Sequence, residues 1–172
     1  MPLLKGDRFI ADSWTFVGKD DALPDGNVVV PLARLIESWG DLAKHPGLVG
    51  AIVPNTERPE TLQPYLNRLS LIVLPFPAFT DGRAYSLARR IRDLGYEGEL
   101  RASGNVLPDQ LQFMLQVGFD TFEVPDRFPE AVWTQAVQAM KLTYQTGGGR
   151  LPIWKARHPG LAEAWDEQPH AG

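Results

Sequence analysis

The sequence predicts an α/β protein of about five parallel βα units, preceded by a small N-terminal β-element. Short apolar runs alternate with amphipathic stretches between residues 28 and 144. The connections between them are too short for anything except βαβ units, whose crossovers are right-handed. We expect an open three-layer sheet or, alternatively, an incomplete βα barrel, because a complete eight-unit barrel usually needs about 250 residues.

Each element has its own signal. LLKGDRFI and WTFV, near the start, have the turn and β-favouring residues of short strands. Apolar runs predict parallel strands at 27–30, 48–54, 70–77, 99–103 and 121–124. Helical spacing of apolar residues predicts a first helix from Leu32 to near His45-Pro46-Gly47 and further helices at 56–69, 83–95, 108–117 and 129–144. Ile36, Leu94 and Met140 are expected on the inward faces of these helices, and Pro64 is expected to kink or delay the second.

Residues 1–150 are expected to form one domain. The remainder, 151–172, lacks a clear period and is expected to be a partly disordered C-terminal arm. Leu151, Ile153 and Trp154 follow a run of glycines, so we expect the arm to pack on another surface of this chain or of a second copy, as in a homo-oligomer.

Composition excludes several classes of function. The chain has no cysteine, which removes disulfides, thiol nucleophiles and every cysteine-ligated metal, cluster or haem site. Its net charge of −4 gives no general affinity for nucleic acid or anionic membranes. Without an export signal or a run of about 20 apolar residues, we expect a cytoplasmic protein.

In such folds ligands bind beyond the carboxyl ends of the strands. The loop Thr80-Asp81-Gly82-Arg83 follows one predicted strand, and free N–H groups at the start of its helix, with Arg83 beside them, would suit an anion. An ordinary helix cap by Thr80 or Asp81 is the alternative. Ser103-Gly104-Asn105 follows the next strand and, with its single glycine, is similar to a phosphate-binding turn.

Arginines set this part of the chain apart. Arg101 lies within a predicted strand, where it needs either a ligand or a carboxylate such as Glu123. Arg89, Arg90 and Arg92 are expected on the solvated helix face. We therefore expect Arg83 and Arg101 to be the functional members of the set.

Other chemistry is less marked. Asp81, Asp109 and Glu123 are candidate acid/base groups at the strand ends. Neither a Walker loop nor GxGxxG occurs, and the three histidines are far apart, so neither a standard nucleotide fold nor a histidine-ligated metal site is indicated.

The block LPFPAFTDGRAYSLARRIRDLGYEGELRASGNVLPDQLQFMLQVGFDTFEV resembles the central part of a bacterial domain family of unknown function. Members are commonly labelled probable oxidoreductases involved in sulfite reduction. With the start MPLLKGDRFIADSW the resemblance covers about residues 1–145. The family usually has Asp at the position of Asn105 and Arg at that of Pro108, so one acidic and one basic group of that loop are absent here.

The resemblance implies a place in assimilatory sulfite reduction, but a chain without cysteine cannot ligate the sirohaem and iron–sulfur centre that six-electron reduction needs. We therefore expect an accessory protein that binds a small anionic metabolite at the strand ends, with its cofactor unknown. The alternatives are a non-catalytic partner of sulfite reductase components and an acid/base enzyme acting on a phosphorylated or carboxylated metabolite.

Overall fold

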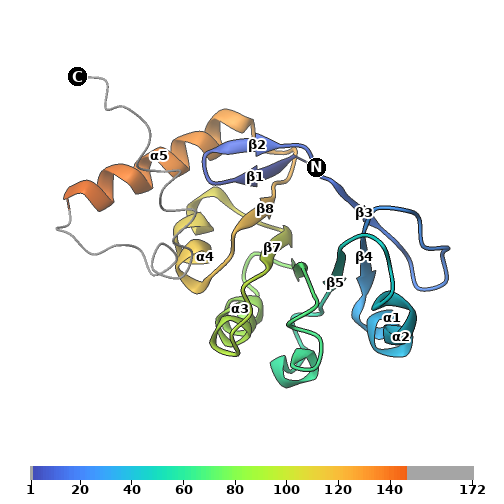
Figure 1. Cartoon of the computed structure of the whole chain (residues 1–172). Helices are drawn as coiled ribbons and strands as arrows, with labels where there is room; N and C mark the ends of the chain where they lie inside the picture. Colours follow the sequence, from blue (N-terminus) through green and yellow to red (C-terminus); the bar gives the residue numbers. More distant parts are fainter. Residues whose placement is uncertain (1, 147–172) are drawn as a thin grey trace.

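The computed structural model describes residues 2–146, with side chains as far as Ala139. It has a mixed α/β architecture built on one open, strongly curled sheet of eight strands (Figure 1). The strands are β1 (Leu3–Lys5), β2 (Arg8–Ile10), β3 (Trp14–Phe16), β4 (Asn27–Pro31), β5 (Val49–Ile52), β6 (Leu71–Phe76), β7 (Glu99–Gly104) and β8 (Thr121–Glu123). The helices are α1 (Leu32–Glu37), α2 (Trp39–Leu42), α3 (Arg83–Asp93), α4 (Leu111–Val117) and α5 (Glu130–Thr146), with 3₁₀ turns η1 (Pro59–Leu62) and η2 (Pro108–Gln110).

The strand order is β2-β1-β8-β7-β6-β5-β4-β3, and every pair from β3 to β8 is parallel. The predicted parallel pairing is therefore confirmed for the strands around Val29, Ile52, Val73 and Leu100. Because the order of β3 to β8 follows the chain without a reversal, this parallel part of the sheet is wound in one direction. It corresponds to the incomplete-barrel alternative rather than to a three-layer sheet.

The N-terminal β-element is not a separate unit. β1 pairs antiparallel with both β2 and β8, whereas β3 pairs with β4 at the other edge. β2 and β3 are the two edge strands of the sheet, and residues 11–13 alone join the end of β2 at Ile10 to the start of β3 at Trp14. These two edges therefore approach within about 14 Å of each other. Figure 1 shows this connection crossing the open side of the curled sheet. We call residues 11–13 the crossing segment.

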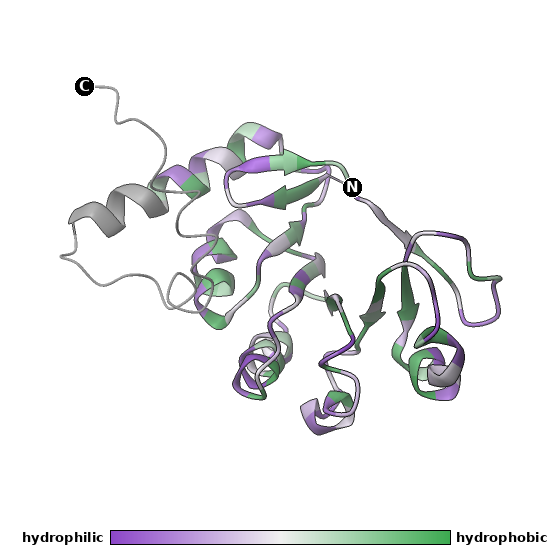
Figure 2. Ribbon diagram, in the orientation of Figure 1, coloured by the Kyte–Doolittle hydropathy of each residue, from purple (hydrophilic) through white to green (hydrophobic). Residues whose placement is uncertain are grey.

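The core has two parts because strand side chains alternate between the two faces. In Figure 1 helices α1 to α4 lie outside the curl, and the larger cluster packs there, between these helices and strand residues such as Val30, Leu74 and Phe122. A smaller cluster of Val29, Leu71 and Val73, with Trp14 and Ile52 against it, lies on the opposite, inner face. The apolar residues in Figure 2 follow the strands and the sheet-facing sides of the helices.

Three expectations about the helices are wrong. Residues 56–69 form turns and the 3₁₀ helix η1, because Pro64 has no N–H and its ring would clash with the carbonyl of residue 60 in an α-helix. The first helix breaks at Ser38 into α1 and α2. Ile36 and Leu94 are exposed; Leu94 follows the end of α3, and Tyr96 is buried instead.

Other boundaries agree with expectation. The predicted helices at 83–95 and 129–144 correspond to α3 and α5, and 108–117 corresponds to η2 and α4. The side chain of Met140 and the arm 151–172, with its suggested role in a homo-oligomer, lie outside the described part of the chain. No helix among residues 2–146 is long and apolar enough to cross a membrane.

Candidate functional site

The loops after β5 and β6 meet, as the sequence predicts for neighbouring parallel strands. Asn55, buried in the loop after β5, donates from Nδ2 to Oδ2 of Asp81 at 2.8 Å. Asp81 lies in the loop after β6, two residues before Arg83, where α3 begins. Asp81 therefore links the two loops that follow β5 and β6.

The carboxylate of Asp81 occupies the start of α3. Its Oδ1 accepts a hydrogen bond from the backbone N–H of Arg83 at 3.2 Å, and both of its oxygens accept from the Arg83 guanidinium, at 2.9 and 2.6 Å. The guanidinium of Arg83 is the main reason that the pKa of Asp81 lies well below its usual range. The anion predicted at this helix start is thus supplied by the chain itself, while Thr80 and Gly82 are exposed.

The turn at Ser103-Gly104-Asn105 ties the end of β7 to β6. Asn105 donates from Nδ2 to the carbonyl oxygen of Pro77 at 2.7 Å and from its backbone N–H to that of Phe76 at 2.9 Å. Gly104 has φ +87°, and a Cβ there would lie 2.7 Å from the Phe76 oxygen. Only glycine permits this close approach, so this glycine has a structural role.

Arg127 extends this group of residues, and the sequence reasoning did not single it out. It follows β8, and its Nη1 donates to Oδ1 of Asn105 at 3.2 Å. Its position three residues after a predicted strand was the signal that could have found it. Loops after β5, β6, β7 and β8 thus contribute Asn55, Asp81 with Arg83, Asn105 and Arg127 respectively.

Arg101 belongs to a separate network on the inner face of the sheet. Its side chain is 1% exposed and pairs with three carboxylates: Asp12 at 2.7 Å, Glu99 at 3.0 Å and Glu123 at 3.5 Å. The pair with Glu123 that the sequence offered as an alternative to a ligand is present. Asp12 reaches Arg101 from the crossing segment, a contact 89 residues apart in sequence that no local pattern could predict.

Three acids around one base leave Glu123 in an unusual environment. Burial is the main reason that its pKa lies above the ordinary value of 4.5, although Arg101 opposes the shift. Its Oε1 is buried and accepts no hydrogen bond within the described part of the chain. Thr121, beside Arg101 on β8, donates to Glu99 at 2.7 Å and completes the network.

The three candidate acid/base residues lie in different surroundings. Asp81 pairs with Arg83, and Glu123 pairs with Arg101. Asp109 is exposed in η2, where its charge adds to the effect of burial in raising the pKa of Tyr85. Their recorded contacts do not join them into one catalytic group.

The expectation that Arg92 is solvated is wrong. It is 6% exposed, pairs with Asp120, and donates to the carbonyl oxygens of Tyr96, Gly98 and Gly118. Gly118 has φ +111°, and a Cβ there would lie 2.7 Å from Cγ of Arg92. Arg89 and Arg90 are exposed, as expected, and pair with Asp93 and Glu60.

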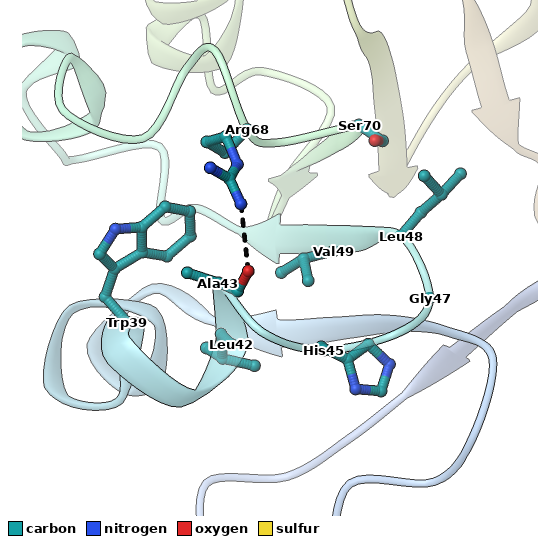
Figure 3. Close-up of a pocket in the computed structure, with 9 residues that line it drawn as sticks. All are labelled: Trp39, Leu42, Ala43, His45, Gly47, Leu48, Val49, Arg68 and Ser70. Atoms are coloured by element: carbon teal, nitrogen blue, oxygen red, sulfur yellow. Dashed lines mark hydrogen bonds between the residues drawn. The ribbon is translucent and has the colours of Figure 1, made fainter.

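A pocket of about 120 Å³ lies away from these loops, beside the amino ends of β5 and β6 (Figure 3). Arg68 and His45 are among its lining residues. Between residues 2 and 146, no group of three or more His, Asp or Glu side chains is placed to hold a metal ion.

Comparison with known families adds one finding. A family described as a bacterial protein of unknown function (DUF934) matches residues 50–154, more than half of the chain. The chain belongs to this family. The DUF934 match begins within β5, and so includes Arg83, Arg101, Asn105 and Arg127 but not the crossing segment with Asp12. A search of curated proteins found no match.

Proposed function

We propose that this DUF934 protein is an accessory protein of assimilatory sulfite reduction that works by binding another protein, a component of sulfite reductase. The place in sulfite reduction rests on the sequence resemblance described above. The accessory role rests on composition, since no cysteine is present to hold the redox centre of a reductase.

The neutralised arginines are the observation that carries this proposal. Arg83 is paired with Asp81, and Arg101 is surrounded by Asp12, Glu99 and Glu123. An oxyanion at either position would have to displace a carboxylate that already makes charge-assisted hydrogen bonds. This favours the non-catalytic interaction partner over an anion-binding or acid/base protein.

An exposed aromatic surface near these loops supports a protein contact. Phe79, in the loop after β6, and Phe113, on α4, are each 52% exposed. Phe113 packs on Tyr85 with ring centroids 4.9 Å apart, and Gln110 beside it donates to the carbonyl oxygen of Phe79 at 2.9 Å. Aromatic side chains are enriched at the centres of protein interfaces.

Sedimentation of the purified chain with sulfite reductase components tests the proposal. We expect a complex that the double variant Phe79→Ser, Phe113→Ser weakens at least tenfold, or about 1.4 kcal/mol. Ile36→Ser, which removes an exposed apolar side chain on α1, is the matched control and should bind as the parent does. No complex with any component, or equal loss in both variants, would reject the proposal.

A second candidate, binding of a small anionic metabolite at the strand ends, is favoured by Arg127. Its recorded hydrogen-bond partner is the neutral amide of Asn105. Thermal-shift screening with sulfite, sulfate and phosphosugars tests this, because a ligand of the folded state raises its melting temperature. For a ligand found in this screen, Arg83→Ala or Arg127→Ala should weaken binding by about 1.5–3 kcal/mol, and Arg90→Ala should not. That result would replace the first candidate.

A further inference from the structure

The pocket in Figure 3 has an apolar floor and one aromatic wall. Leu42, at the end of α2, and Val49, at the start of β5, are buried and line it. The ring of Trp39 forms a side, and it is held edge-on against Tyr65 with centroids 5.0 Å apart. Because Leu42 and Val49 are almost fully buried, the apolar part of the lining is a small area beside the Trp39 ring, and the rest of the lining is mostly polar.

The charge of the lining is positive. Arg68 and His45 belong to it, and none of its nine residues is acidic. Nε2 of His45 lies 2.7 Å from the carbonyl oxygen of Gly26, so that nitrogen carries the proton and donates, which fixes the ring. A cation is disfavoured in such surroundings.

Arg68 differs from the arginines of the predicted site. It is exposed, and its Nη2 donates to the carbonyl oxygen of Ala43 at 3.1 Å. Among the described residues it forms no ion pair with a carboxylate. A guanidinium has five N–H donors, so Arg68 keeps both its charge and free donors for a ligand.

The size of the pocket limits the ligand. An apolar cavity of about 150 Å³ in another protein holds benzene, so about 120 Å³ suits roughly five or six non-hydrogen atoms. Nucleotides and sugar phosphates are too large to be enclosed. A carboxylate matches a planar guanidinium through paired hydrogen bonds.

We propose that this pocket binds a small monocarboxylate. Its small apolar body packs against the Trp39 ring, above Leu42 and Val49, and its carboxylate accepts hydrogen bonds from Arg68. The site lies beside the amino ends of β5 and β6, whereas Phe79 and Phe113 belong to the loop after β6 and to α4. The inference is therefore independent of the proposed protein contact.

Titration with isobutyrate, followed by ¹⁵N NMR of the whole chain, tests the proposal. We expect a saturable shift of the Trp39 indole N–H signal, assigned with Trp39→Phe. Isobutyramide and isobutylamine, which have the same apolar body but are neutral and cationic, should bind at least tenfold more weakly.

Arg68→Gln should weaken isobutyrate binding by about tenfold or more, the loss of a hydrogen bond to a charged group, and Arg68→Lys should restore part of it. Arg58→Gln, at another exposed arginine that does not line the pocket, is the matched control and should bind as the parent does. Thermal unfolding of each variant verifies that it is folded. Equal affinity for acid, amide and amine, unchanged affinity in Arg68→Gln, or no shift at Trp39 would overturn the proposal.

Discussion

Arg92 and Arg101 are both buried, yet their surroundings differ. Arg92, at the end of α3, pairs with one carboxylate and donates to three backbone carbonyls of the turns that follow α3 and α4. Arg101, on the inner face of β7, is surrounded by three carboxylates from β7, β8 and the crossing segment. Arg92 donates hydrogen bonds to backbone carbonyls in the turns after two helices, whereas the positive charge of Arg101 balances the charge of several carboxylates.

This difference shows that a buried arginine has more than one structural use. The donors of Arg92 satisfy carbonyls that would otherwise be buried without a partner, which costs free energy. The charge of Arg101 permits three acids to lie together at one side of the sheet. The unfolding free energy that is lost on replacing Arg101 should therefore depend on pH more strongly than the loss on replacing Arg92. The following predictions test that contrast.

Arg101→Met should have the largest effect. Removing the one cation leaves Asp12, Glu99 and Glu123 facing one another, and the loss should be about 3–5 kcal/mol of unfolding free energy at pH 7. Because protonation would relieve the repulsion among these neighbouring acids, the loss should shrink as pH falls towards 4. Urea unfolding at several pH values measures this. A loss that is independent of pH would contradict the description of the site as an acid-rich network.

Arg92→Met should cost somewhat less, about 3 kcal/mol, since it leaves one carboxylate and three carbonyls without this donor. Asp120 is the one acid that pairs with Arg92 in the described part of the chain, and it keeps a hydrogen bond from the backbone N–H of Leu100 at 2.8 Å, so the variant brings no acids together. The loss should therefore change little between pH 5 and pH 8. The same urea experiment supplies the comparison, and a pH dependence as strong as that of Arg101→Met would remove the contrast.

Glu123→Gln should have a smaller effect of opposite sign. Burial raises the pKa of Glu123, so folding disfavours its charged form. The parent should lose stability as pH rises from the ordinary pKa of Glu123 through the raised one, and the Gln variant should not. At pH 7 the variant should equal or exceed the parent in stability, with the two converging near pH 4. A variant markedly less stable at pH 7 would show that the Glu123 charge stabilises the fold.

Asp81→Asn should have the smallest effect, because the partner of Asp81, Arg83, is mostly exposed. The pKa of Asp81 is lowered, so its contribution is present above the ordinary Asp range and is lost as pH falls below that range. Melting temperatures of parent and variant should differ by a constant amount from pH 7 to pH 5 and then converge at lower pH. Convergence above pH 5 would contradict the lowered pKa.

The positions of the polar loops could be predicted from the chain, but their partners could not. Apolar runs placed the ends of β5, β6 and β7 well enough to predict that the loops following them share one edge, and the structure shows that these loops hold Asn55, Asp81 and Asn105. That the Asp81 carboxylate pairs with Arg83, and so occupies the predicted anion position itself, depends on side-chain geometry. Arg92 was misplaced because helical periodicity treats every charged residue as solvated and cannot foresee acceptors in the turn at Gly118.

Local pattern was sufficient for the parallel strands β4 to β8 and for the helices α3 and α5, since these depend on residue type and on spacing over a few turns or strand residues. Composition alone excludes cysteine-ligated centres. The curl of the sheet, the division of the N-terminal strands between its two ends, and the pairing of Asp12 with Arg101 required the folded chain. The physical reason is range. Periodicity records which face of an element is apolar. Ion pairing joins Asp12 to Arg101, 89 positions away, strand pairing joins Leu3 to the still more distant Glu123, and the geometry of both is set by the packing of the whole sheet.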